Sequence, residues 1–187
     1  MFINLQTFKI AQSMGFDQKN IFHRAAKLLE EQGELSDAID LDDLPEMIEE
    51  SVDNLLVVTS IAFVLDHTAM DKAQALVNDV FLAAVAENAL ESDPVSIRLF
   101  LKYVGRNGKL SDAIQKQQKI AASSYKGFLT SEETLVYVLE SLTLLMKFMA
   151  TLTHDVDLIN RLILKKNDKW LAKSIEGREK ALLAISA

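Results

Sequence analysis

A seven-residue segment that occurs twice constrains the fold of this chain more than any other feature. Residues 33–39 read GELSDAI and residues 108–114 read GKLSDAI, so the two differ at one position and are offset by 75 residues. A strongly apolar stretch follows each copy, SVDNLLVVTSIAF at 51–63 and VLESLTLLMKFMA at 138–150. Chance similarity between helix-forming sequences is the alternative explanation. The same order of elements after both copies favours an internal duplication.

The residue types around this repeat favour helices. Only six glycines and two prolines interrupt 187 residues, and Leu, Ala, Glu and Lys are strong helix formers. One helical hairpin buries little apolar surface, so two copies are expected to pack together as a four-helix bundle with additional helices. We therefore predict a single all-α domain over 1–187, with one copy of the hairpin at 18–90 and a degenerate copy at 94–173.

Turn and capping signals divide the chain into seven predicted helices. The first predicted helix ends in a turn at about 14–17. The next five run over about 18–39, 45–65, 71–90, 95–121 and 130–153. The last follows a turn at 154–157 and runs to about 173, where a polar tail begins. The GRNGK segment at 105–109 is expected to interrupt or kink the fifth helix. Three helix starts carry capping signals: Asp43 with Pro45 and Glu46, Asp93 with Pro94, and Thr130 with Glu133.

Composition excludes several classes of site. The chain has no cysteine, which rules out disulfides, thiolate metal sites and a cysteine nucleophile. A net charge of −7 argues against nucleic acid as a partner, because phosphate affinity comes from Lys and Arg. MFINLQTFKI lacks the pattern of a signal peptide, and the longest nearly apolar run, residues 55–65, is about half a membrane span. We expect a cytoplasmic protein with no membrane contact.

Two pairs of acidic residues share a spacing that places each pair on one helix face. Glu31 and Glu34 are three residues apart, as are Glu50 and Asp53 on the next predicted helix. Fifteen residues separate Glu34 from Glu50, which is enough for the second helix to return antiparallel. Solvated surface charge is the ordinary explanation for such pairs. Here the helix becomes apolar almost all round from Leu55 onwards, so we expect its acids to face the interior of the bundle.

Converging carboxylates repel one another and lose hydration, so a cation is needed to compensate them. The neighbouring sequence offers no histidine or cysteine at ligand spacing. An oxygen-only ligand set indicates a hard divalent cation, Mg²⁺ or Mn²⁺.

These motifs resemble a known family. EEQGE at 30–34 followed by ESVD at 50–53 is similar to the EExxE…ExxD signature of the all-α nucleotide pyrophosphohydrolases, which include MazG-like proteins, dimeric dUTPases and phosphoribosyl-ATP pyrophosphohydrolase. KKNDKW at 165–170 resembles the Lys- and Asn-rich end of the last helix in MazG-like sequences. The resemblance implies four catalytic and metal-binding residues: Glu31, Glu34, Glu50 and Asp53. Glu30 occupies the leading position of the motif, whose role is less defined.

The activity implied by the resemblance is Mg²⁺-dependent hydrolysis of a nucleoside triphosphate to the monophosphate and pyrophosphate. The attacking water would approach the α-phosphorus in line with the leaving pyrophosphate. The alternative function is a non-catalytic helical member of the same fold that binds a nucleotide or a protein. The sequence leaves open the base and sugar, the number of metal ions, the carboxylate that activates water, and whether the chain forms a homodimer.

The second copy has lost the acids. The 75-residue offset places Gly105, Arg106 and Lys109 at the positions of the three motif glutamates, and the following helices align Tyr137 with Glu50 and Glu140 with Asp53. We therefore predict a division of labour in which the first copy holds metal and the second contacts substrate. Ordinary surface charge is the alternative for the basic residues, and helix packing for Trp170. The predicted substrate-binding residues are Lys27, Glu30, Arg106, Lys109, Lys166, Asn167, Lys169 and Trp170.

Overall fold

The computed structural model describes residues 2–14, 20–88, 97–118 and 129–185. In chain order its helices are α1 (Gln6–Met14), α2 (Ile21–Asp40), α3 (Leu44–Leu65), α4 (Ala69–Asn88), α5 (Ile97–Gln118), α6 (Ser131–Leu152) and α7 (Val156–Ile185). No strand occurs in these four ranges. The prediction of an all-α fold is confirmed.

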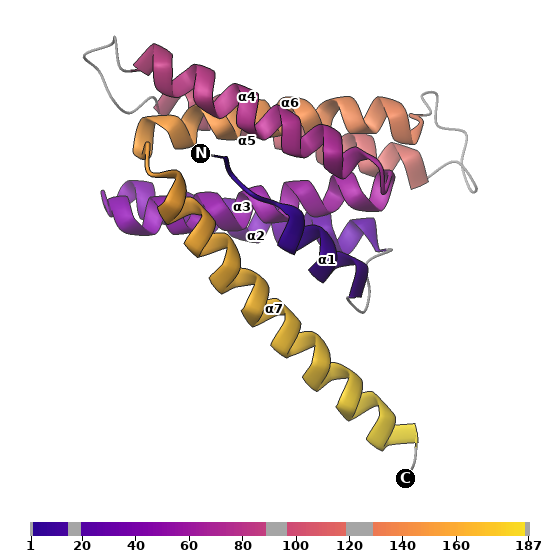
Figure 1. Ribbon diagram of the computed structural model, residues 1–187. Coiled ribbons are helices and arrows are strands. Elements are labelled where there is room, and N and C mark those ends of the chain that lie inside the picture. Colours follow the sequence, from indigo (N-terminus) through magenta and orange to yellow (C-terminus); the bar gives the residue numbers. More distant parts are fainter. Residues whose placement is uncertain (1, 15–19, 89–96, 119–128, 186–187) are drawn as a thin grey trace.

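Two helical hairpins form the body of the protein (Figure 1). α2 packs along α3, and α5 packs along α6. α3 and α6 lie against each other, and α4 packs on α6. Every residue of α3 from Ser51 to Phe63 is buried, as its apolar sequence predicts. The predicted bundle with additional helices is confirmed, and its core lies between α3 and α6.

The N-terminal segment ties α4 to α7. The backbone N–H of Ile3 donates to Asn78 Oδ1 of α4 at 2.8 Å. The backbone N–H of Asn4 donates to Asn160 Oδ1 of α7 at 2.8 Å, and Asn160 Nδ2 donates to the Phe2 carbonyl at 3.0 Å. α1 packs against α7, which crosses the α2/α3 hairpin obliquely before its C-terminal end extends beyond the bundle (Figure 1). α7 therefore carries the 165–170 segment to α3.

Two of the predicted caps are present. Thr130 and Glu133 form a reciprocal capping box at the start of α6. Asp43 accepts a hydrogen bond from the Glu46 backbone N–H, and proline occupies the first turn of α3. α2 begins at Ile21, later than predicted, because the Asn20 side chain caps the N–H groups of residues 22 and 23. The predicted turn near 15–17 and the predicted cap at Asp93 and Pro94 lie outside the described residues.

Two predictions about helix shape were wrong. α5 runs without a break through residues 105–109, where an interruption was expected. Tyr103 and Leu110 are buried on either side of that segment, so packing against the bundle outweighs the roughly 1 kcal/mol that each glycine costs a helix. α7 continues to Ile185, past the predicted end near 173, because the polar residues of this tail are themselves good helix formers.

By length and composition alone, one helix of the described residues, α6, is apolar enough to span a membrane. A core helix passes the same test. α6 packs against α3, α4 and α5, and its side chains form much of the shared core.

Candidate metal site

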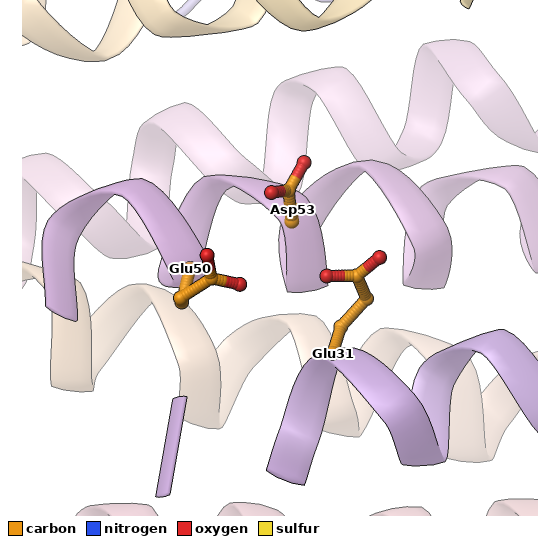
Figure 2. A group of neighbouring side chains, drawn as sticks. All are labelled: Glu31, Glu50 and Asp53. Carbon is orange, nitrogen blue, oxygen red and sulfur yellow. The ribbon is translucent and has the colours of Figure 1, made fainter. Parts of the chain in front are cut away.

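Three carboxylates converge between α2 and α3. Figure 2 shows Glu31 on one helix and Glu50 and Asp53 on the other, with their side chains directed toward the same space. One carboxylate oxygen from each lies within 4.8 Å of the other two. Glu31 is 4 % exposed, and Glu50 and Asp53 are each 7 % exposed. The predicted convergence of acids from two helices is present for these three residues, and solvated surface charge does not describe them.

Asn54 fixes how far α2 is shifted along its axis relative to α3 at this cluster. Its Nδ2 donates to the Glu31 carbonyl at 2.8 Å and to the Glu50 carbonyl at 2.9 Å. Its Oδ1 accepts from the Tyr103 hydroxyl of α5 at 2.9 Å. Asn54 and Tyr103 are fully buried, so these bonds are shielded from water. One side chain next to Asp53 therefore joins three helices and positions the acids.

Burial dominates the electrostatics of the cluster. Loss of hydration, reinforced by repulsion from Asp53, raises the pKa of Glu50 to about 8. Burial also raises the pKa of Asp53, although a hydrogen bond from Lys166 opposes the shift. The pKa of Glu31 is raised by burial, while Lys27 acts in the opposite direction. Because proximity and burial both disfavour three negative charges, the cluster has a strong affinity for positive charge.

Two lysines supply part of that charge. Lys27 Nζ lies 2.5 Å from Glu31 Oε1 and 2.8 Å from Glu30 Oε1. Lys166 Nζ of α7 contacts Asp53 Oδ2 and lies 3.0 Å from Glu49 Oε1. Burial disfavours the charged form of each lysine, but the carboxylate contacts outweigh it and raise the pKa of both amines. Both lysines are therefore cationic at neutral pH.

Glu50 has no such partner. Its Oε2 atom is buried and has no hydrogen-bond donor among the described residues. The cluster opens into a cavity of about 680 Å³, which we call the acidic pocket. Its oxygen-only donors and the unpartnered Glu50 oxygen fit a hard divalent cation such as Mg²⁺ or Mn²⁺. The acidic pocket is lined by Lys27, Glu30, Glu31, Glu34, Asp37, Ala38, Leu41, Asp43, Glu46, Glu49, Glu50, Asp53, Lys166, Lys169, Trp170 and Lys173.

Comparison with family models identifies the segment that holds these acids. Residues 20–86 match the MazG nucleotide pyrophosphohydrolase domain. This segment is similar to the MazG nucleotide pyrophosphohydrolase domain, which is consistent with the all-α MazG-like superfamily. The match covers α2, α3 and nearly all of α4, and it contains the three converging acids. No curated protein and no solved structure matches the chain significantly.

Glu34 stands apart from the other three acids of the MazG-like motif. It lines the acidic pocket but is exposed, and it does not belong to the group of converging oxygens. Its carboxyl group still interacts with Glu31, whose pKa it helps to raise. Glu30 is exposed and paired with Lys27, which lowers the pKa of Glu30. The MazG-like signature thus places three acids in the interior and two at the rim.

α7 brings basic residues to the MazG-like domain. Lys166, Lys169 and Trp170 line the acidic pocket, as their assignment to substrate binding requires. Asn167 does not line it, and its Nδ2 donates to Thr7 Oγ1 of α1 at 3.1 Å. Trp170 packs edge-on against Phe8 with ring centroids 5.7 Å apart. Asn167 and Trp170 therefore hold α7 on α1. Trp170 also lines the acidic pocket.

Arg106 and Lys109 lie at a different cavity. Together with Lys102, Gly105 and Leu144 they line a space between α5 and α6 of about 350 Å³, and neither residue lines the acidic pocket. Within this chain, the expected contribution of the second copy through Arg106 and Lys109 is therefore not brought to the acids. The second copy reaches the acidic pocket through Lys166 and Lys169 of α7, which belong to the same set of predicted substrate-binding residues.

Sequence reasoning missed three residues that organise the site. Asn54 and Tyr103 link α2, α3 and α5, and Glu49 binds Lys165 and Lys166 of α7. Asn54 carries a signal in the sequence, since it is an amide at the start of an otherwise apolar run. Tyr103 and Glu49 give no such signal in the sequence. The partner of Tyr103 lies 49 residues away, and the partner of Glu49 lies 116 residues away.

Proposed function

We propose that the acidic pocket hydrolyses a nucleoside triphosphate to the monophosphate and pyrophosphate with Mg²⁺ as cofactor, and that Mn²⁺ can replace it. The observation that carries this proposal is the buried cluster of Glu31, Glu50 and Asp53 inside a MazG-like domain, with one Glu50 oxygen left unpartnered. Deoxynucleotides and ribonucleotides both belong to the substrate class, and the proposal places the reaction in the cytoplasm.

The three buried carboxylates would hold the cation, which when bound neutralises phosphate charge and lowers the pKa of water. Lys166, Lys169 and Lys173 line the pocket on α7 and are placed to bind phosphate oxygens. Lys166 is already charged, so it would exchange its contact with Asp53 for one with the substrate. Cationic contacts on the leaving pyrophosphate stabilise the charge that develops as the bond to the α-phosphorus breaks.

Glu34 is the acid we assign to the attacking water. It is exposed at the rim of the acidic pocket and lies outside the buried trio, so its carboxylate is available as a proton acceptor. Replacing it by glutamine preserves size while removing that basicity. We expect Glu34→Gln to keep the metal-dependent thermal shift and lose turnover.

Pyrophosphate release from a panel of NTPs and dNTPs with Mg²⁺ tests the proposed reaction. We expect turnover of at least one nucleotide by the wild type and none above background by Glu50→Gln. Glu87→Gln is the matched control, because Glu87 is exposed on α4 and does not line the acidic pocket. Release of orthophosphate instead of pyrophosphate would contradict cleavage at the α-phosphorus.

One observation favours a second function, a non-catalytic protein that binds a nucleotide or a partner. The amine of Lys166 contacts Asp53 directly, which would satisfy the acids without a metal if the contact were permanent. That function predicts no turnover of any nucleotide and no thermal shift with Mg²⁺ or Mn²⁺. Either turnover or a metal shift that Glu50→Gln abolishes would exclude it.

A further inference from the structure

The wall that α5 gives to the cavity between α5 and α6 uses the same positions as the wall that α2 gives to the acidic pocket. Four of the five residues that line this cavity come from α5: Lys102, Gly105, Arg106 and Lys109. The residues 75 positions earlier all line the acidic pocket: Lys27, Glu30, Glu31 and Glu34. The offset of the sequence repeat is therefore also the offset between two cavities. We call the second one the basic cavity.

The basic cavity carries positive charge that nearby side chains do not balance. Arg106 Nη1 lies 2.6 Å from Glu140 Oε2, and this is the only ion pair of its three cations within the described ranges. Lys102 and Lys109 are exposed and have no carboxylate partner in those ranges. Lys27, the counterpart of Lys102, is instead held by two glutamates of its own helix. An anion at the basic cavity would therefore relieve a local repulsion in a chain whose net charge is −7.

We propose that the basic cavity binds an anion of the pyrophosphate class, with two linked phosphoryl groups, and without a metal ion. Lys102 and Lys109 are seven residues apart, which corresponds to a rise of roughly 10 Å along α5. Two linked phosphoryl groups span more of this distance than one phosphate does, so they can contact all three cations with less bending of the lysine side chains. Charge-assisted hydrogen bonds from lysine and arginine are the usual means of binding phosphate oxygens.

Two neighbouring features suit such an anion. Gly105 leaves space beside Lys102, because a Cβ atom there would meet nothing within 4 Å. The Arg106 guanidinium lies over the ring of Tyr137, 5.9 Å from its centroid, which keeps it at the cavity that both lysines also line. Tyr137 and Arg106 stand where the acidic pocket has Glu50 and Glu31. The basic cavity therefore binds without hydrolysing, and the proposal holds whether or not the acidic pocket is catalytic.

Calorimetric titration of the full chain with pyrophosphate, in EDTA and at low salt, tests the proposal. Lys102→Ala and Lys109→Ala should each weaken binding about tenfold, and the double variant about a hundredfold. Lys72→Ala is the matched control, since Lys72 is an exposed lysine of α4 outside both cavities. Lys169→Ala removes a phosphate contact proposed at the acidic pocket, so a loss of affinity in this variant that is absent from the Lys102→Ala, Lys109→Ala double variant would assign the anion to the acidic pocket. All four positions are exposed, so the variants are expected to fold.

Three results would overturn the proposal: no binding by the wild type, equal weakening by Lys72→Ala, or unchanged affinity in the Lys102→Ala, Lys109→Ala double variant. Orthophosphate binding as tightly as pyrophosphate would overturn the requirement for two linked groups. Titration with ADP then distinguishes a nucleotide diphosphate from free pyrophosphate as the ligand. Tighter binding of ADP identifies the diphosphate end of a nucleotide as the ligand, and tighter binding of pyrophosphate identifies the free anion.

Discussion

The α2/α3 and α5/α6 hairpins place opposite chemistry on matching positions. In the first hairpin Glu31 and Asp53 face the same space and rely on Lys27 and Lys166 for compensation. In the second, Arg106 and Glu140 stand at those positions and bind each other directly. Both hairpins pack into one bundle. The comparison indicates that the bundle packs without the acidic residues. The repulsion between the carboxylates of the first hairpin is therefore tolerated for a reason other than packing.

The largest effect is expected from copying the second hairpin into the first. Glu31→Arg should pair with Asp53 as Arg106 pairs with Glu140, while removing one carboxylate of the proposed metal site. We expect pyrophosphate release to fall on the order of a thousandfold and the thermal shift with Mg²⁺ to disappear. Far-UV circular dichroism should show an intact helical fold.

The reverse exchange, Arg106→Glu, is the control for that experiment. Arg106 does not line the acidic pocket, so turnover should stay within about twofold of wild type. If Arg106→Glu reduced turnover as strongly as Glu31→Arg, the second hairpin would contribute to the reaction through a neighbouring subunit. Comparing the two variants in cross-linked and monomeric fractions would then show whether a homodimer supplies the contact.

The next effect concerns the stability of the fold. It compares Asn54 of α3 with Ser141 of α6, which stand at equivalent positions when the two helices are aligned. Asn54 makes three buried hydrogen bonds, whereas Ser141 of α6 is buried with its hydroxyl unpartnered among the described residues. Asn54→Ala leaves the buried Tyr103 hydroxyl unsatisfied and removes two buried bonds to helix carbonyls, so it should lower the free energy of unfolding by about 3 kcal/mol. Ser141→Ala should change it by less than about 0.5 kcal/mol. Urea denaturation measures both, and equal losses would contradict the role given to Asn54.

How far the sequence predicts this structure depends on the sequence separation of the contacts. The caps at Asp43 and Thr130 involve residues three apart, and both were predicted from local spacing. The pairing of Glu31 with Glu50 and Asp53 required one antiparallel turn and was also predicted. Lys166 reaches Asp53 across 113 residues, and no local pattern sets the angle at which α7 crosses α3.

The same reasoning explains the errors. The glycines at 105 and 108 were expected to break α5, but local propensity did not include the buried contacts of Tyr103 and Leu110 on the opposite face. Arg106 and Lys109 were predicted to bind substrate because they replace Glu31 and Glu34 at the 75-residue offset of the repeat. Their true location depends on how the hairpins pack, which places the two cavities on separate pairs of helices. The internal duplication itself stays a prediction, supported by the shared offset of the cavities.

The pH dependence of stability distinguishes Glu50 from Tyr137 at the matching position. The pKa of Glu50 rises from 4.5 to about 8 on folding, so the folded state binds the proton more tightly. Its contribution to stability is complete below pH 4.5 and is lost between pH 4.5 and 8. The melting temperature of the metal-free protein should therefore fall over this range, and Glu50→Gln should flatten the fall.

Metal should reverse that trend, because binding displaces the proton from Glu50. The thermal shift with Mg²⁺ or Mn²⁺ should be larger at pH 8 than at pH 6. Differential scanning fluorimetry measures both slopes. A wild-type melting temperature that rises from pH 5 to pH 8 without metal, in parallel with Glu50→Gln, would contradict the assigned shift.

The smallest effect is expected at the ion pair of the second hairpin. Arg106 and Glu140 are partly exposed, so a double-mutant cycle of Arg106→Ala and Glu140→Ala should give a coupling of about 0.5 kcal/mol that weakens with salt. Such a weak pair leaves the guanidinium free to turn toward an anion in the basic cavity. A coupling above about 2 kcal/mol would instead make the pair a structural element. In that case Arg106 would be committed to Glu140, and only the two lysines would remain to bind phosphate.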